Sequence, residues 1–257
     1  MEVIRETIEH KEFLKQFTLQ QLRGRYRGSA LGFLWTFFIP VLTLAAFTLF
    51  FSIINRGNGG SRLPMVLSAY APWLFFTTAT GMAIYSIVAN SVYITKVRSP
   101  KSILPLSMVV ISLIELAAFV LALLLFVPLV GGSIGPAVLF LPVSIVLLSV
   151  FTLGFCLLVA TMNVFLRDVA LLWVPLSLVW FLLTPIFYRI EDVPAEFRVL
   201  LEANPILPFI RLFQDPIAHG VLPSAETIVM ATLYAVIMFS FGSAIFTKSQ
   251  KSFYSYV

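Results

Sequence analysis

The stretch RGRYRGSALGFLWTFFIPVLTLAAFTLFFSII, residues 23–54, decides the fold of this chain. It begins with three arginines separated by glycine and tyrosine, and it continues from residue 31 to residue 54 without a charged side chain. A helix of about 20 residues crosses the ~30 Å hydrocarbon core of a bilayer. Because Lys and Arg collect on the cytoplasmic side of membrane proteins, the stretch predicts a first transmembrane helix with a cytoplasmic N-terminal flank.

The composition of the whole chain is also that of a membrane protein. Of the 257 residues, 60% are hydrophobic and only 11% are charged, so a soluble fold would expose a very large apolar surface. The net charge of +5 does not indicate nucleic acid, because the basic residues flank apolar spans and form no basic domain. We therefore expect an all-α integral membrane protein that forms one domain over residues 1–257, without a nucleic-acid partner.

Long stretches without charge predict six transmembrane helices. With six spans both termini lie on one side, and that side carries 12 of the 17 Lys and Arg residues. The positive-inside tendency then predicts that both termini are cytoplasmic. The six predicted spans are residues 31–54, 67–93, 103–130, 137–163, 171–188 and 227–246.

Two regions outside the spans have patterns of their own. Within residues 1–30, apolar residues recur at helical spacing among charged ones, which is typical of an amphipathic helix on the cytoplasmic membrane surface. Residues 189–226 collect six acidic residues around two apolar pieces that are too short to span and are separated by Asn204 and Pro205. This second region predicts an interfacial or re-entrant hairpin on the outer side.

The chain lacks the motifs of several kinds of chemistry. None of its 13 glycines is followed by lysine, so it has no GxxxxGK[ST] loop, and any ATP chemistry must come from another polypeptide. The two histidines, His10 and His219, are predicted on opposite sides of the membrane, so we expect no metal site and no catalytic residue. The single Cys156 excludes an internal disulfide.

Glu115 is a charged residue near the middle of the third predicted span. An ionised carboxylate costs about 2.5–3.5 kcal/mol at that depth, which makes Glu115 a candidate proton-relay or gating group. A protonated glutamate that is hydrogen-bonded to a neighbouring helix would instead serve packing alone. We expect no second charge within the membrane beside it, and both interpretations stay open.

Aromatic residues make up 14% of the chain and gather in the first, second and fifth predicted spans. Flat rings suit the apolar C–H faces of sugars, whereas most aromatic residues in membrane proteins pack in the core or at the interfaces. The candidates for a translocation path are Trp35, Phe38, Tyr70, Tyr85, Trp173, Trp180 and Tyr188.

The predicted cytoplasmic loop ITKVRSPKSILPLS, residues 94–107, is short and cationic. Its three cations surround Pro100, between two long spans. Such a loop either docks into a partner protein or anchors the neighbouring spans through its positive charge.

Several motifs together resemble the permease subunit of ABC-2 type exporters, in particular those for O-antigen, capsular polysaccharide or teichoic acid. The resemblance implies a homodimer that works with two copies of a P-loop ATPase subunit, which binds ATP and Mg. It also implies an N-terminal interface helix, a coupling helix at residues 94–102 and external gate helices within residues 189–226. The motifs are RYRGSALGFLWTFFIP (25–40), KVRSPKSILPLS (96–107), NVFLRDV (163–169), TPIFY (184–188) and ANPI (203–206).

The coupling residues that the resemblance implies all lie between the second and third spans. Members of the family often have an aromatic residue and an Arg–Glu pair around the loop proline, whereas serine and lysine flank Pro100 here. The implied contacts to the ATPase are Thr95, Lys96, Val97, Arg98, Ser99 and Lys101.

The leading hypothesis is therefore a non-enzymatic permease of the bacterial cytoplasmic membrane. It would export a lipid-linked polysaccharide through a channel between two copies of the chain, in contact with membrane lipid. An ABC-2 permease for a small hydrophobic drug or lipid is the alternative within the family. Two alternatives lie outside the family. One is a membrane enzyme that acts on lipid-linked sugars, with Glu115 or the group Glu191, Asp192 and Glu196 as catalysts. The other is a proton-coupled transporter with Glu115 as the proton carrier.

Overall fold

The computed structural model describes residues 2–54, 62–96, 100–130 and 134–256, and these residues form helices and no strands. The first half of the chain contains α1 (Glu2–Glu9), α2 (Lys11–Arg25), η1 (Gly32–Leu34), α3 (Trp35–Ile54), α4 (Leu63–Ser86), η2 (Val88–Asn90), α5 (Ser91–Lys96) and α6 (Ile103–Phe126). The second half contains η3 (Val127–Val130), η4 (Pro136–Phe140), α7 (Leu141–Phe165), α8 (Asp168–Leu182), η5 (Ile190–Asp192), α9 (Ala195–Glu202), α10 (Leu207–Gln214), η6 (Asp215–His219), α11 (Ala225–Ser249) and η7 (Gln250–Ser255).

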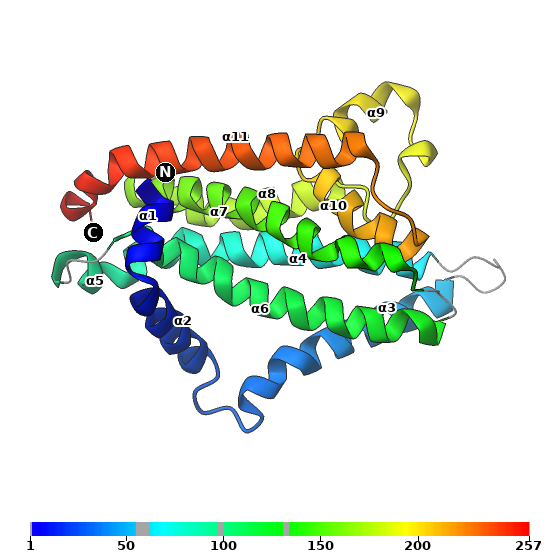
Figure 1. Ribbon diagram of the computed structural model, residues 1–257, viewed down its shortest axis with the longest axis horizontal. Coiled ribbons are helices and arrows are strands. Elements are labelled where there is room, and N and C mark those ends of the chain that lie inside the picture. The colour runs from blue at the N-terminus through cyan, green and yellow to red at the C-terminus, as the bar shows by residue number, and fades with distance from the viewer. Residues whose placement is uncertain (1, 55–61, 97–99, 131–133, 257) are drawn as a thin grey trace.

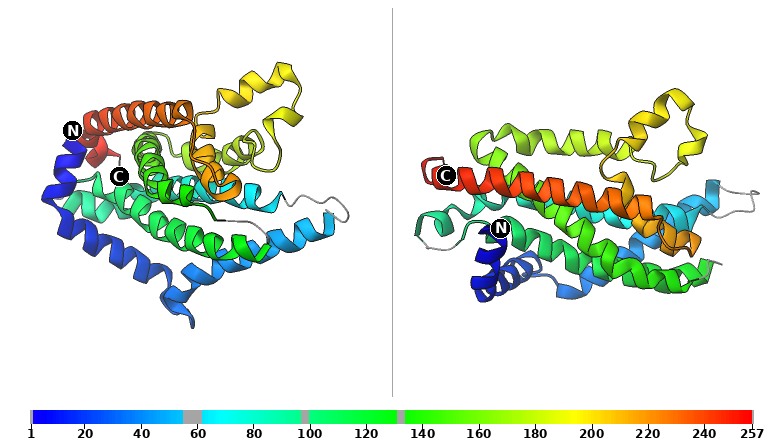
Figure 2. Two further views of the ribbon diagram at one scale, coloured as in Figure 1. Left: turned by 45° about the vertical axis from the view of Figure 1, so that its right-hand side comes forward. Right: turned by 45° about the horizontal axis from the view of Figure 1, so that its top comes forward.

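The long helices run side by side between two ends of the molecule (Figure 1). Helix α4 packs against α6 and α7, and α11 packs along α7, so α4 and α7 form the centre of the bundle. Helix α3 contacts mainly α6 and stays at the periphery. Both termini lie at one end of the bundle, and α9 lies at the opposite end (Figures 1 and 2).

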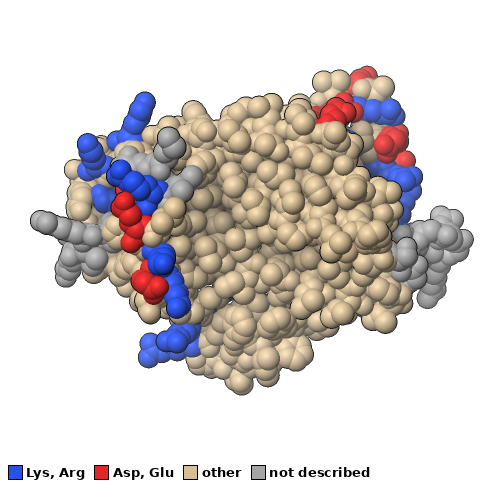
Figure 3. All heavy atoms as spheres, viewed as in Figure 1, with Lys and Arg blue, Asp and Glu red and all other residues tan. Residues whose placement is uncertain are grey.

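Charged residues are confined to these two ends on the face drawn in Figure 3. Between them lies a broad belt of uncharged residues, which is the surface that a bilayer requires. Many large apolar side chains are exposed in this belt, especially on α3 and α8, where Leu49 is 64% and Leu171 is 73% exposed. The helices and the belt together identify a multi-pass membrane protein.

In the described part of the chain, four helical segments are long and apolar enough to cross a membrane. A fifth is the pair formed by α4 and the segment Val88–Ile94, which is bent by 46°. The four are Gly32–Ile53, Ile103–Val130, Pro136–Phe165 and Ala225–Ser255, and they agree with predicted spans. The predicted span at 171–188 corresponds to α8, whose 15 residues cover only about 22 Å, so a count of six is not confirmed by length and composition.

The amphipathic segment at the N-terminus forms two helices, α1 and α2, that meet at His10. Helix α2 packs against α6, and in Figure 1 it slants away from the end that carries the termini. The sequence did not indicate this contact with the bundle, and the position of the segment on the membrane surface stays a prediction. The last residue of α2, Arg25, explains this contact, as described below.

The outer segment forms two short helices on either side of Asn204 and Pro205, where the sequence predicted the break. Helix α9 is largely exposed, whereas α10 packs against α4, α7 and α11 with Phe209 and Phe213 fully buried. The described residues thus have a surface helix and a buried helix here. Their role as gate helices stays a prediction.

Helices α7 and α11 approach each other closely at Gly154 and Gly242. A Cβ atom on Gly154 would lie 2.5 Å from the backbone of Met238 and Phe239, and one on Gly242 would collide with the carbonyl oxygen of Gly154. Small residues let membrane helices approach closely and gain van der Waals contact. These two glycines therefore set the spacing of the helix pair.

We expect Gly242→Ala to destabilise the protein by about 2 kcal/mol or more, because both backbones must move apart. Gly24→Ala is the matched control, since a Cβ atom there meets nothing within 4 Å and alanine favours the helix. The measurement is the thermal unfolding midpoint of the purified protein in detergent. Equal midpoints for the two variants would contradict the close packing of α7 on α11.

Candidate functional site

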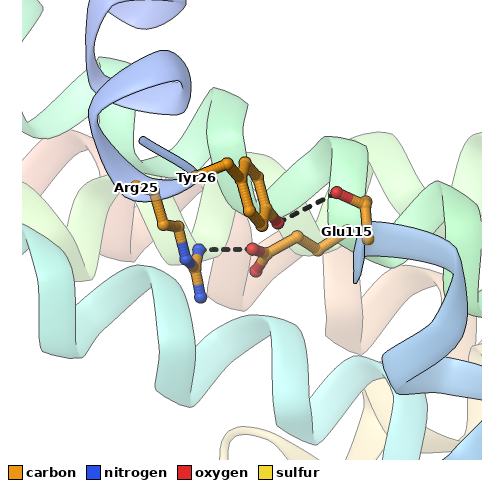
Figure 4. Close-up of polar contacts among 4 residues, drawn as sticks. Arg25, Tyr26 and Glu115 are labelled. Atoms are coloured by element: carbon orange, nitrogen blue, oxygen red, sulfur yellow. Dashed lines mark hydrogen bonds and ion pairs between the residues drawn. The ribbon is translucent and has the colours of Figure 1, made fainter. Parts of the chain in front are cut away.

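Glu115 lies in the middle of α6, about 18 Å along the helix from Ile103. Its carboxylate accepts a hydrogen bond from the Arg25 guanidinium, and the two groups form an ion pair (Figure 4). The side chain of Arg25 is 42% exposed and that of Glu115 is 25% exposed, so the pair lies at the side of the bundle. The sequence predicted no second charge within the membrane beside Glu115, and in the structure Arg25 at the end of α2 lies beside it.

The next residue along the chain adds a second polar contact at this point. The hydroxyl groups of Tyr26 and Thr36 are 2.9 Å apart, so they join the end of α2 to the first turn of α3 (Figure 4). Arg25 and Tyr26 thus bind α6 and α3 respectively. The connection between α2 and α3 is therefore held by two contacts, one to α6 through Arg25 and one to α3 through Tyr26.

A cavity of about 140 Å³ lies beside the ion pair, between α3, α4 and α6. Arg25, Tyr26, Thr36 and Glu115 line one part of it, and apolar residues such as Leu74 and Phe119 line the rest. Ser112, one turn before Glu115, also lines the cavity and is 1% exposed. Its hydroxyl has no hydrogen-bond partner among the described residues. The site is a small, mostly apolar cavity with a polar edge formed by the ion pair and the hydroxyl groups beside it.

The seven aromatic candidates for a translocation path do not come together in one copy of the chain. Tyr70, Trp173 and Trp180 are half-buried inside the bundle, and Trp180 packs edge-to-face against Phe76 with ring centroids 5.2 Å apart. The other four lie apart from this cluster: Trp35 and Phe38 on α3, Tyr85 near the end of α4, and Tyr188 after α8. Their role in a path stays a prediction.

Trp180 takes part in a polar cluster that the sequence did not reveal. Its indole N–H donates to the amide oxygen of Asn204 at 2.8 Å, and the amide nitrogen of Asn204 donates to the Thr184 hydroxyl at 2.9 Å. Asn204 is 7% exposed, so these bonds satisfy a buried amide. These hydrogen bonds join the TPIFY motif, which contains Thr184, to the ANPI motif, which contains Asn204. The presence of both residues in motifs was the sequence signal that could have pointed to the bonds.

The predicted coupling segment is only partly described. Val97, Arg98 and Ser99 lie outside the described residues, and only the backbone of Thr95 and Lys96 is described, at the end of α5. Lys101 is half-buried, and burial lowers the pKa of its ammonium group. Its Nζ donates to the carbonyl oxygen of Gln250 at 2.6 Å. The neighbouring Ser102 donates to Glu6 Oε2 at 2.8 Å.

The outer acidic residues do not form a pair of carboxylates in contact. Glu191 and Glu196 are exposed, and Asp192 lies 3.9 Å from the Arg62 guanidinium, which ties η5 to the start of α4. Nearby, burial raises the pKa of Asp215, while the positive charges of His219 and Arg211 act in the opposite direction. Within the described residues, no group of three or more His, Cys, Asp or Glu side chains is placed to hold a metal ion.

Comparison with known proteins gives one consistent result. Residues 12–217 match the family of ABC-2 type transporters. A protein named O-antigen export system permease protein RfbA, from Myxococcus xanthus, is 30% identical over 257 residues, which cover 98% of this chain and 97% of the relative. A protein of the same name from Klebsiella pneumoniae is 25% identical over 243 residues, which cover 94% of this chain and 93% of the relative. The similarity thus extends over nearly the whole chain.

We expect Glu115→Leu to destabilise the protein by about 1–3 kcal/mol, because it leaves the Arg25 guanidinium without its partner in an apolar environment. Arg25→Met should cost a similar amount, and the double variant should cost less than the sum of the two. Thermal unfolding midpoints of the four proteins in detergent give this double-mutant cycle. Arg27→Met is the control, since Arg27 has no ion pair among the described residues. Additive effects of the two changes would contradict a stabilising ion pair.

Proposed function

The chain belongs to the ABC-2 type transporter family, and on that premise we propose that it is the permease subunit of an ATP-driven exporter. Its substrate is a lipid-linked polysaccharide of the O-antigen class, moved across the bacterial cytoplasmic membrane. The observation that carries this proposal is the similarity to proteins named O-antigen export permease over nearly their whole length. The lack of a GxxxxGK[ST] loop agrees with ATP and Mg bound by a separate subunit.

The proposed topology has six crossings with both termini in the cytoplasm. An odd number of crossings would separate the termini, whereas both lie at the same end of the bundle (Figure 1). Helix α8 supplies the sixth crossing, because it lies between the end of α7 and the outer segment that contains α9. The excess of Lys and Arg in the segments at the end with the termini supports the cytoplasmic assignment.

The proposed conduit forms between two copies of the chain around a two-fold axis. Helices α3 and α8 expose most of their apolar side chains, and Ala170 is the single buried residue of α8 among those described. Large exposed apolar faces fit either lipid or a second copy. Trp35 and Phe38 on α3 are then placed near the axis, where flat rings allow a glycan to slide, whereas Trp173 of α8 packs inward on Phe155.

The proposed coupling to ATP uses segment 94–102 together with α1 and α2. Two ATPase subunits, one for each copy, press on this segment and move α5 and α6. An ABC-2 permease for a small hydrophobic drug or lipid would use the same mechanics, and the substrate assay below separates the two.

We expect the purified chain to form a complex with a P-loop ATPase encoded beside it and to show ATP hydrolysis that increases with lipid-linked polysaccharide. Substrate-dependent phosphate release in proteoliposomes measures this, with a small hydrophobic drug as the comparison substrate. Complex formation with stimulation by the drug alone would favour the alternative. A chain that binds no ATPase and transports glycolipid unaided would contradict the proposal.

Single cysteines should locate the termini and test α8 as a crossing. Lys11, Arg167, Glu196 and Lys251 are exposed, whereas the native Cys156 is buried and should react little. In intact cells, we expect a membrane-impermeant maleimide to label Glu196→Cys but not Lys11→Cys, Arg167→Cys or Lys251→Cys. Permeabilised cells should label all four. Labelling of Arg167→Cys and Glu196→Cys from the same side would show that α8 does not cross.

A further inference from the structure

Three segments that are far apart in the sequence meet at the end of the bundle that carries both termini. They are α1, residues 100–102 and the C-terminal helix η7 (Figure 1). Ser102 bonds to Glu6 of α1, and Lys101 bonds to the Gln250 carbonyl oxygen at the start of η7. Residues from all three segments line one polar hollow. The short stretch before α6 is therefore held from two sides by the two ends of the chain.

The ring of Tyr254 makes the second contact with Lys101. The Lys101 Nζ atom lies 3.8 Å from the centroid of the Tyr254 ring, well inside the range of about 6 Å at which a cation interacts with an aromatic face. Tyr254 is 53% exposed, so its ring is not needed to fill the core. Its neighbour Phe253 is fully buried and packs on Phe246 of α11, with ring centroids 5.5 Å apart. Phe253 anchors η7, and Tyr254 presents its face to the lysine.

Because of the position of Lys101 in the chain, these contacts link two long helices. Lys101 lies two residues before α6 begins at Ile103, at the end of the segment that joins α5 to α6. Its ammonium group is already used by a carbonyl oxygen and an aromatic ring. A carboxylate of another protein would have to displace the ring or use the remaining N–H donor. The contacts connect the start of α6 to the end of α11 through η7.

We propose that Lys101 and Tyr254 are positioning residues for energy coupling. The C-terminal helix holds the end of segment 94–102 in place, so that a push on this segment moves α6 and α11 together. This inference rests on the proposed function, and it changes the role given to Lys101 in that function. Lys101 acts within the chain, and contact with the ATPase falls to the remaining residues of the segment and to the N-terminal helices.

The test measures polysaccharide exported per ATP hydrolysed by the reconstituted permease–ATPase complex. We expect Tyr254→Ala to assemble and to hydrolyse ATP without substrate at the wild-type rate, with export per ATP reduced about fivefold. Tyr254→Phe keeps the ring face and should restore coupling. Tyr256→Ala is the control, because Tyr256 belongs to the same tail but packs on Phe165, with ring centroids 5.0 Å apart. Wild-type coupling in Tyr254→Ala, or an equal loss in Tyr256→Ala, would overturn the proposal.

A second measurement does not depend on the ATPase. Trypsin must take the Lys101 side chain into its own pocket, so release from Tyr254 has to precede cleavage after Lys101. We expect faster cleavage at this bond in purified Tyr254→Ala than in the wild type or Tyr256→Ala, read by mass spectrometry of the fragments. Equal rates would show that the contact does not hold Lys101. If the wild-type chain binds no ATPase while the cleavage rates differ as expected, the proposed function fails and the contact stands.

Discussion

The cost of placing charge in hydrocarbon is the constraint on which this structure depends. On the face drawn in Figure 3, it confines charged residues to the two ends and leaves an uncharged belt between them. Glu115 is the exception within the long spans, and it is accompanied by Arg25, so neither charge stands alone. The pair ties the end of α2 to the middle of α6. A helix that its amphipathic pattern would place on the surface is thereby drawn against the bundle.

Features that depend on local sequence were predictable, and contacts between distant segments were not. Charge-free stretches located the long apolar helices, and Asn204 with Pro205 located the break between α9 and α10, because hydropathy and helix breaking act over neighbouring residues. The partner of Glu115 lies 90 residues away, and Gly154 meets Gly242 across a helix pair. Nothing local to these residues indicates their partners.

The candidate site follows the same division. The cationic character of segment 94–102 is evident from the sequence, but the attachment of Lys101 to the C-terminal tail requires the fold. The aromatic candidates were chosen by residue type alone, and the fold separates Tyr70, Trp173 and Trp180 in the interior from four others on α3, at the end of α4 and after α8. Asn204 escaped notice because its importance lies in bridging Trp180 and Thr184, which are 24 and 20 residues away.

The length of α8 has a consequence for the lipid around it. Its 15 residues cover about 22 Å, several ångströms less than the hydrocarbon core of an ordinary bilayer. A bilayer adapts to a short hydrophobic segment by becoming locally thinner. If α8 crosses the membrane as proposed, we expect the bilayer to be thinner beside this helix, which would shorten the path of a polar headgroup through hydrocarbon.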